Sequence, residues 1–164
     1  MASDLAKAYR ALSNKKTYYD KLWDYYDGDH TIKYASSRLK EVFGSSLAKF
    51  VENWCAVVVD TAWERLELIG FEIGSSTEAQ DRIVSMWKET ELDLDAMDAH
   101  LATLVTGEAF VLVWLDQEGN VKAYYNDPRL CHVQYDAEDP RKKNWAAKWW
   151  VTPDSRYRLN LYYG

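Results

Sequence analysis

The sequence predicts an α+β domain in which amphipathic helices come first and an antiparallel β-meander follows. Over residues 1–108, apolar residues recur at three- and four-residue spacing, as on the buried side of helices. Over 109–164 they occur in short runs and in two-residue alternation between turn sequences, as in strands. Helices that precede hairpin-linked strands are typical of the α+β class. We therefore predict one domain with a helical part, 1–108, and a sheet part, 109–164.

The composition indicates a globular protein with an unusual supply of aromatic side chains. Aromatic residues make up 15% of the chain, which favours either a thick core or a surface that meets another chain. The formal charge of −6 argues against a protein that grips nucleic acid, because neutralising phosphates requires clustered Lys and Arg. Cys55 and Cys131 are too few for a disulfide scaffold and are predicted to be core residues.

The sequence contains no membrane or export signal. No apolar run approaches the roughly 18 to 20 residues of a membrane span, and the first residues do not form a signal peptide. The product is therefore predicted to be made in the cytoplasm. The chain ends inside its last predicted strand, so we expect it to be a piece of a longer polypeptide.

The first predicted helix begins at Ser3 or Asp4, which can cap it, and runs to the turn Asp27-Gly28-Asp29. In this turn the glycine supplies a positive φ, and the carboxylates bond nearby backbone amides. A short helix follows, which begins at Ser36 or Ser37 and runs through Phe43 until Gly44 ends it.

Residues 53–73 are predicted to be the element around which the chain is organised. Ser45 or Ser46 caps its helix, Gly70 ends the helix with a left-handed cap, and 71–73 form a short strand. One stripe of the helix is expected to be buried, and it consists of Cys55, Val58, Val59, Ala62 and Leu66. The opposite face carries Asp60, Glu64 and Glu67.

Two further helices complete the helical part. Thr77 and Gln80 form a capping box for the first of them. Asp93 caps the second, and Gly107 lies just past its end.

Five strands are predicted in the sheet part. Residues 110–114 form a continuous apolar run, which predicts a central strand covered on both faces. Turns then lead into strands at 121–125 and, after Asn126-Asp127-Pro128, at 131–135. The last two strands alternate around a turn at 152–155, and one face of the first of them carries Trp145, Ala147, Trp149 and Val151.

No set of catalytic, metal-binding or cofactor-binding residues stands out. The histidines His30, His100 and His132 have no cysteine or acidic partners at metal spacing. A calcium loop centred on Gly28 would place Trp23 where a carboxylate is required. No glycine-rich phosphate loop occurs either. The sequence therefore predicts no metal and no cofactor.

Two chemical hypotheses remain beside a purely structural one. Asp60 and Glu64 lie four residues apart on a helix and could serve as the acid and base of a hydrolase, but a solvated helix face is preferred. Trp145 and Trp149 share a strand face and could form a carbohydrate- or peptide-binding module. Filling of the core beneath the helices explains that face too and is preferred.

The order of several short motifs resembles the N-terminal part of tailed-phage portal proteins. After the first helix come Tyr25-Tyr26-Asp27-Gly28-Asp29-His30, Asn53-Trp54-Cys55, Val59-Asp60, Glu64-Arg65-Leu66 and Gly70-Phe71. Then follow Trp87, Leu92-Asp93, His100, Gly107 with the run 110–114, and Asp127-Pro128-Arg129. The resemblance covers nearly the whole chain and assigns it to the peripheral wing region of such proteins.

The resemblance implies a structural protein rather than an enzyme. Portal proteins form a ring, usually of twelve subunits, at one capsid vertex of the virion, and double-stranded DNA is packaged and ejected through it. Capsid, scaffold, terminase and head-completion proteins are the implied partners. The resemblance implies structural or intersubunit roles for Asp27, Gly28, Asn53, Asp60, Glu64, Arg65, Gly107, Asp127 and Pro128. The acidic composition suits a conduit through which DNA slides, because strong phosphate binding would hold it.

Overall fold

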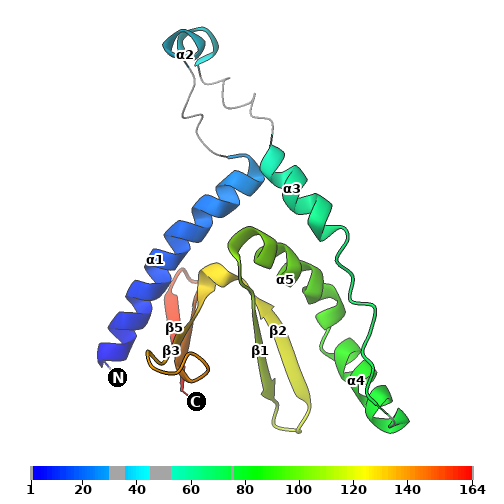
Figure 1. The fold of residues 1–164 in the computed structure, drawn as a ribbon. Coiled ribbons are helices and arrows are strands. Elements are labelled where there is room, and N and C mark those ends of the chain that lie inside the picture. The colour runs from blue at the N-terminus through cyan, green and yellow to red at the C-terminus, as the bar shows by residue number, and fades with distance from the viewer. Residues whose placement is uncertain (1, 30–35, 45–52, 75, 164) are drawn as a thin grey trace.

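The computed structural model describes residues 2–29, 36–44, 53–74 and 76–163 and confirms the α+β class (Figure 1). The described helices come first: α1 (Ala2–Asp27), α2 (Ser37–Phe43), α3 (Trp54–Trp63), α4 (Thr77–Glu89) and α5 (Leu92–Thr106). The strands follow: β1 (Phe110–Leu115), β2 (Val121–Asn126), β3 (Cys131–Tyr135), β4 (Lys143–Val151) and β5 (Tyr157–Tyr163), with the short 3-10 helix η2 (Pro128–Leu130) before β3. None of the described helices is long and apolar enough to cross a membrane.

The strands are divided between two antiparallel sheets. β3, β4 and β5 form the predicted meander, and β1 pairs with β2 in a separate hairpin. The prediction that 110–114 is a central strand is wrong, because β2 is the one neighbour of β1 among the described strands. The apolar side chains of β1 are not covered on both faces, and Val113 is 61% exposed.

The core lies between α1 and the three-stranded sheet. Ala8 and Leu12, four residues apart on α1, are completely buried against Trp145 and Ala147, which alternate on one face of β4. Trp149, Leu159 and Leu161 pack around this cluster. The predicted core face of the strand at 145–151 is confirmed at Trp145 and Ala147.

The N-terminal helix differs from its prediction only at its start. α1 begins at Ala2, so Ser3 and Asp4 lie inside the helix and not at its predicted cap position. The turn after it is confirmed, since Gly28 adopts a φ of 75°. The short helix α2 is also confirmed: the Ser36 side chain accepts from the Leu39 amide, and Gly44 ends the helix.

The stretch 53–73 is not the organising element that its sequence predicts. α3 ends at Trp63, before Leu66 and Gly70, and 71–73 form no strand. The Gln80 side chain instead donates to the Phe71 carbonyl and accepts from the Ile73 amide. It bonds the backbone groups that a neighbouring strand would otherwise bond. Asn53 caps the helix by accepting from the Ala56 amide at 3.1 Å, and Ser45 and Ser46 lie outside the described residues.

The apolar stripe of α3 is exposed rather than buried, which contradicts the prediction. α3 has no buried residue, the Cys55 thiol is exposed, and Val58 is 70% exposed. A helical period predicts that the apolar stripe packs against another apolar surface, but it does not identify that surface.

The last two helices use other caps than those predicted. Ser76, not Thr77, caps α4 by accepting from the Ala79 amide. Asp93 lies inside the first turn of α5, which follows Glu91 in a left-handed conformation. The neighbouring Asp95 carboxylate accepts from the Tyr125 amide at 2.8 Å and so ties α5 to β2. The predicted end of α5 is confirmed, because Gly107 has a φ of 89°.

Candidate functional site

A polar junction joins the end of α1 to the start of α3 and brings together three of the predicted motif residues. The Asn53 side-chain amide donates to the Tyr26 carbonyl, while its oxygen caps α3. The Tyr26 hydroxyl donates to the Asp60 carboxylate at 2.8 Å. Gly28 lies directly against the Asn53 side chain. Asp27, the last residue of α1, stands beside this junction.

The junction depends on a neutral tyrosine. Burial, the hydrogen bond to Asp60 and the nearby carboxylate charges raise the pKa of Tyr26 to about 12. The hydroxyl therefore remains a donor at neutral pH, and its hydrogen bond to the Asp60 carboxylate joins α1 to α3.

Replacing Gly28 with alanine is expected to destabilise the junction by about 1–2 kcal/mol, the cost of a left-handed conformation for an L-residue. The added Cβ would also lie 3.3 Å from Asn53 Nδ2. Gly107→Ala is the matched control, because Gly107 has a similar φ and a Cβ added there would meet no atom within 4 Å. Thermal unfolding should show a larger loss for Gly28→Ala than for Gly107→Ala. Equal losses would mean that the contact with Asn53 has no energetic role.

A second junction, between α1 and β4, is built by Asp127, Pro128 and Arg129. The Asp127 carboxylate caps η2 by accepting from the Arg129 amide at 2.7 Å, and it also accepts from Nε and Nη2 of the Arg129 side chain. The Arg129 guanidinium lies 5.1 Å from the ring of Trp23 on α1. The backbone carbonyl of Arg129 accepts from Trp149 Nε1. Pro128 is completely buried. This turn therefore joins α1 to β4.

A third junction, which the sequence does not predict, involves Lys15 and Tyr19 on α1. Both contact the Glu108 carboxylate, Lys15 through an ion pair and Tyr19 through a hydrogen bond of 2.6 Å. Lys15 also donates to the Cys131 carbonyl at 2.9 Å and lies over the Phe110 ring. Because Glu108 precedes β1 and Phe110 begins it, Lys15 is the point at which α1 meets both sheets.

The structure separates Glu64 and Arg65 from these junctions. Both side chains are exposed at the end of α3, and neither makes an ion pair or side-chain hydrogen bond with the described residues. Asp60 is engaged by Tyr26. In the proposed acid–base pair of a hydrolase, Asp60 is therefore hydrogen-bonded to Tyr26, and Glu64 is exposed to solvent.

The structure also removes the stacking platform proposed for Trp145 and Trp149. Trp145 is only 7% exposed, whereas Trp149 meets the ring of Tyr9 edge-on at 5.8 Å. A cavity of about 370 Å³ lies beside Trp149 instead, and its lining consists of Tyr9, Lys16, Leu130, Trp149, Trp150, Val151 and Tyr157. Its residues come from α1, η2, β4 and the start of β5, so no local pattern could identify it.

His132 on β3 is half-buried beside Lys15 and has an unpartnered Nε2 within the described part of the chain. Burial and the Lys15 charge lower its pKa, against the opposing effects of Gln134 and Glu108. In the unfolded chain the imidazole takes up its proton near pH 6.5. The folded state binds that proton only at lower pH, so stability is lost as the pH falls from about 6.5 through the folded-state pKa.

The wild type should therefore have a lower free energy of unfolding at pH 5.5 than at pH 7.0, and this difference should be smaller in His132→Gln. Urea unfolding at the two pH values measures both differences. The glutamine variant removes the titrating group and keeps a polar side chain in place. An unchanged difference between the two pH values in the variant would assign the acid sensitivity to other residues.

Much of the chain's apolar surface meets no other described residue. The accessible surface is 12532 Å² for a mass of 19.1 kDa, whereas a compact monomer of that mass exposes roughly 8,400 Å². The excess is roughly 4,000 Å² over polar and apolar atoms together. Apolar residues of α2, α3 and β1 contribute to it, and they include Leu39, Val42, Val57, Val58, Val111, Val113 and Leu115.

The described residues contain no group of three His, Cys, Asp or Glu side chains that could hold a metal ion. The three junctions bond several polar side chains to one another, and many large apolar side chains are exposed. This arrangement can hold helices and sheets at fixed angles and present apolar faces to other chains.

Comparison with known proteins agrees with such an arrangement. Residues 6–163 match the model of a family described as phage portal protein, SPP1 Gp6-like. No curated protein matches the chain significantly.

Proposed function

The chain belongs to the SPP1 Gp6-like family of phage portal proteins, and from this premise we propose that it is the wing region of a head-to-tail connector. In this proposal, copies of the protein form a ring at one capsid vertex of the virion, and double-stranded DNA is packaged and ejected through the ring. The helical part, 1–108, and the sheet part, 109–164, form one wing domain. The role is structural and involves no catalysis.

The family match over nearly the whole chain is the observation that carries this proposal. The exposed apolar surface supports it, because a subunit of a ring must meet a neighbour on each of two sides. The acidic composition supports a conduit in which DNA moves rather than binds, since the chain carries 26 acidic residues against 20 Lys and Arg.

The proposed partners follow from the same premise. A portal at a capsid vertex meets capsid and scaffold proteins during assembly, the terminase during packaging, and head-completion proteins afterwards. We propose that Glu64 and Arg65, which are exposed at the end of α3, make intersubunit polar contacts. Asp27, Gly28, Asn53, Asp60, Gly107, Asp127 and Pro128 are proposed to set the shape of the subunit.

Electron microscopy of the purified full-length gene product tests the proposal. Rings of uniform size are expected, with a mass that is a multiple of the subunit mass by native mass spectrometry. A protein that stays monomeric over a wide concentration range would contradict it. Glu64→Lys with Arg65→Glu, which exchanges the two charges, should lower the ring yield without changing the thermal stability of the subunit.

A further inference from the structure

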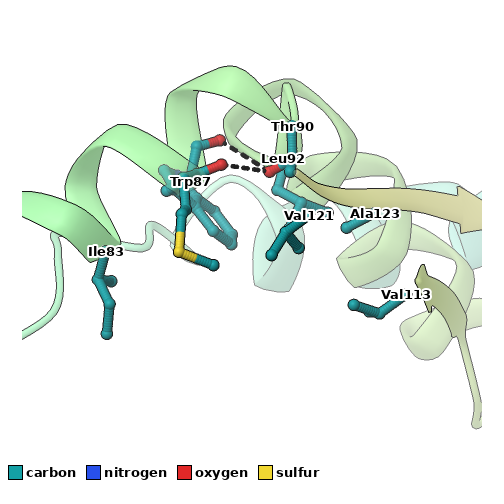
Figure 2. Close-up of a pocket in the computed structure, with 8 residues that line it drawn as sticks. Ile83, Trp87, Thr90, Leu92, Val113, Val121 and Ala123 are labelled. Carbon is teal, nitrogen blue, oxygen red and sulfur yellow. Dashed lines mark hydrogen bonds between the residues drawn. The ribbon is translucent and has the colours of Figure 1, made fainter. Parts of the chain in front are cut away.

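An apolar groove lies between α4 and the β1–β2 hairpin. It has a volume of about 250 Å³ and is lined by Ile83, Met86, Trp87, Thr90, Leu92, Val113, Val121 and Ala123. Figure 2 shows lining side chains from α4 on one side of the groove and from the two strands on the other. The groove is therefore formed by residues far apart in the sequence.

The groove is lined almost entirely by apolar side chains. Its one polar lining residue, Thr90, is buried, and its hydroxyl contacts the carbonyls of Met86 at 2.8 Å and Trp87 at 3.1 Å (Figure 2). Val113 at the rim is exposed. Such a surface is expected to bind apolar side chains and not a polar small molecule.

α2 carries the side chains that such a groove would accept. Leu39, Val42 and Phe43 lie at positions i, i+3 and i+4, which is the spacing of anchors in helix-in-groove recognition. All three are exposed, Val42 to 69%, and α2 has no buried residue. Figure 1 shows α2 apart from the other helices.

Charge favours the α4 groove over the aromatic cavity beside Trp149. α2 contributes the cations Arg38 and Lys40 and the single acid Glu41. The elements that form the groove are acidic in sequence, because residues 77–98 and 110–126 carry nine carboxylates against the three cations Arg82, Lys88 and Lys122. The aromatic cavity has Lys16 in its lining and Lys148 over the ring of Trp150. Opposite charges around an interface increase the association rate and exclude wrong partners.

We propose that α2 of one copy docks in the α4–hairpin groove of the neighbouring copy. This inference rests on the proposed ring and names the contact that joins adjacent subunits. The donor helix and the acceptor groove are different surfaces of one chain, so the contact is heterologous and can be repeated from copy to copy until the ring closes.

Disulfide trapping between two separately labelled full-length proteins tests the contact in trans. One protein carries Val42→Cys and the other Val113→Cys, both in a Cys55→Ser background because the native Cys55 thiol is exposed. Val42 and Val113 are both exposed in the single chain, so the substitutions leave the fold intact. The matched control replaces Val42→Cys with Glu41→Cys, which lies on the opposite face of α2.

After assembly of the mixture and mild oxidation, a heterodimer should form at least about tenfold faster with Val42→Cys than with Glu41→Cys, because docking raises the effective concentration of the two thiols. Equal rates in rings that form normally would overturn the docking inference and leave the proposed function standing. A double variant, Val42→Cys with Val113→Cys in one chain, is tested at a concentration too low for assembly. If its disulfide forms within the single chain, the docking inference is likewise overturned and the proposed function stands. Absence of rings in the wild type would overturn both.

Discussion

Leu12→Ala is expected to lower the free energy of unfolding by about 2–5 kcal/mol, the range for a leucine truncated in a packed core. Leu12 is completely buried and belongs to the cluster that holds α1 against Trp145 and Ala147 of β4. The cavity left by the substitution lies between two rigid elements, so the surroundings cannot collapse fully around it. Urea denaturation followed by tryptophan fluorescence measures the loss, since Trp145 lies in the affected cluster.

Leu5→Ala on the same helix is the control for this prediction. Leu5 is 48% exposed, and the substitution keeps the helix propensity favourable. Its effect should stay within about 0.5 kcal/mol, as for other surface positions. A loss at Leu5 as large as that at Leu12 would show that α1 contributes through its own helicity and not through the core with the sheet.

Glu108→Ala is expected to cost about 2–3 kcal/mol, because it removes the shared acceptor of two α1 side chains. The Tyr19 hydroxyl would lose its 2.6 Å hydrogen bond, and the Lys15 ammonium, whose side chain is 13% exposed, would lose its ion pair. The expected cost lies below that of a fully buried pair, since the Glu108 side chain is 36% exposed and water screens part of the interaction.

The tyrosine provides a second measurement of the same change. Burial, the hydrogen bond to Glu108 and the Glu108 charge raise the pKa of Tyr19. In Glu108→Ala the latter two effects disappear, so the Tyr19 pKa should fall toward its ordinary value, as followed by ultraviolet absorbance in alkali. Glu108→Gln keeps the shape and an acceptor, and it should recover part of the stability but not the ion pair. Identical stabilities for Glu108→Ala and Glu108→Gln would contradict the role of the hydrogen bond.

Local structure could be predicted well because its causes are local. Gly28, Gly44 and Gly107 end or follow helices with the positive φ that only glycine adopts easily. The alternation around Trp145 and Ala147 indicates the correct buried face of β4. The errors at helix starts have a local cause too, since several neighbouring residues can cap. Ser76 takes the place that Thr77 could have filled.

Long-range packing could not be predicted in the same way. The stripes of α1 and α3 are both apolar, yet Leu12 is buried and Val58 is exposed. Which stripe meets the sheet depends on the tertiary arrangement, and no sequence period carries that information. The continuous apolar run in β1 is misleading for a related reason: it predicts that both faces are covered, but Val111, Val113 and Leu115 are exposed.

Only part of the site could be predicted, for the same physical reasons. Gly28, Asn53 and Asp60 do lie together, because one turn and one helix cap bring the ends of α1 and α3 into contact. Asp127 and Pro128 lie in one tight turn. The junction at Glu108 could not be predicted, since Glu108 lies 89 residues from Tyr19 and no motif connects them. The groove beside α4 could not be predicted for the same reason.

The position of α1 at the start of the chain has a consequence for biosynthesis. Its core partners on β4, Trp145 and Ala147, follow Leu12 by more than 130 residues. At the roughly 5–20 residues per second of translation, the apolar face of α1 is synthesised about 7–27 s before the strands that cover it. Nascent chains therefore carry an uncovered amphipathic helix for most of their synthesis, and the yield of folded protein should rise at lower growth temperatures and with chaperones that hold such helices.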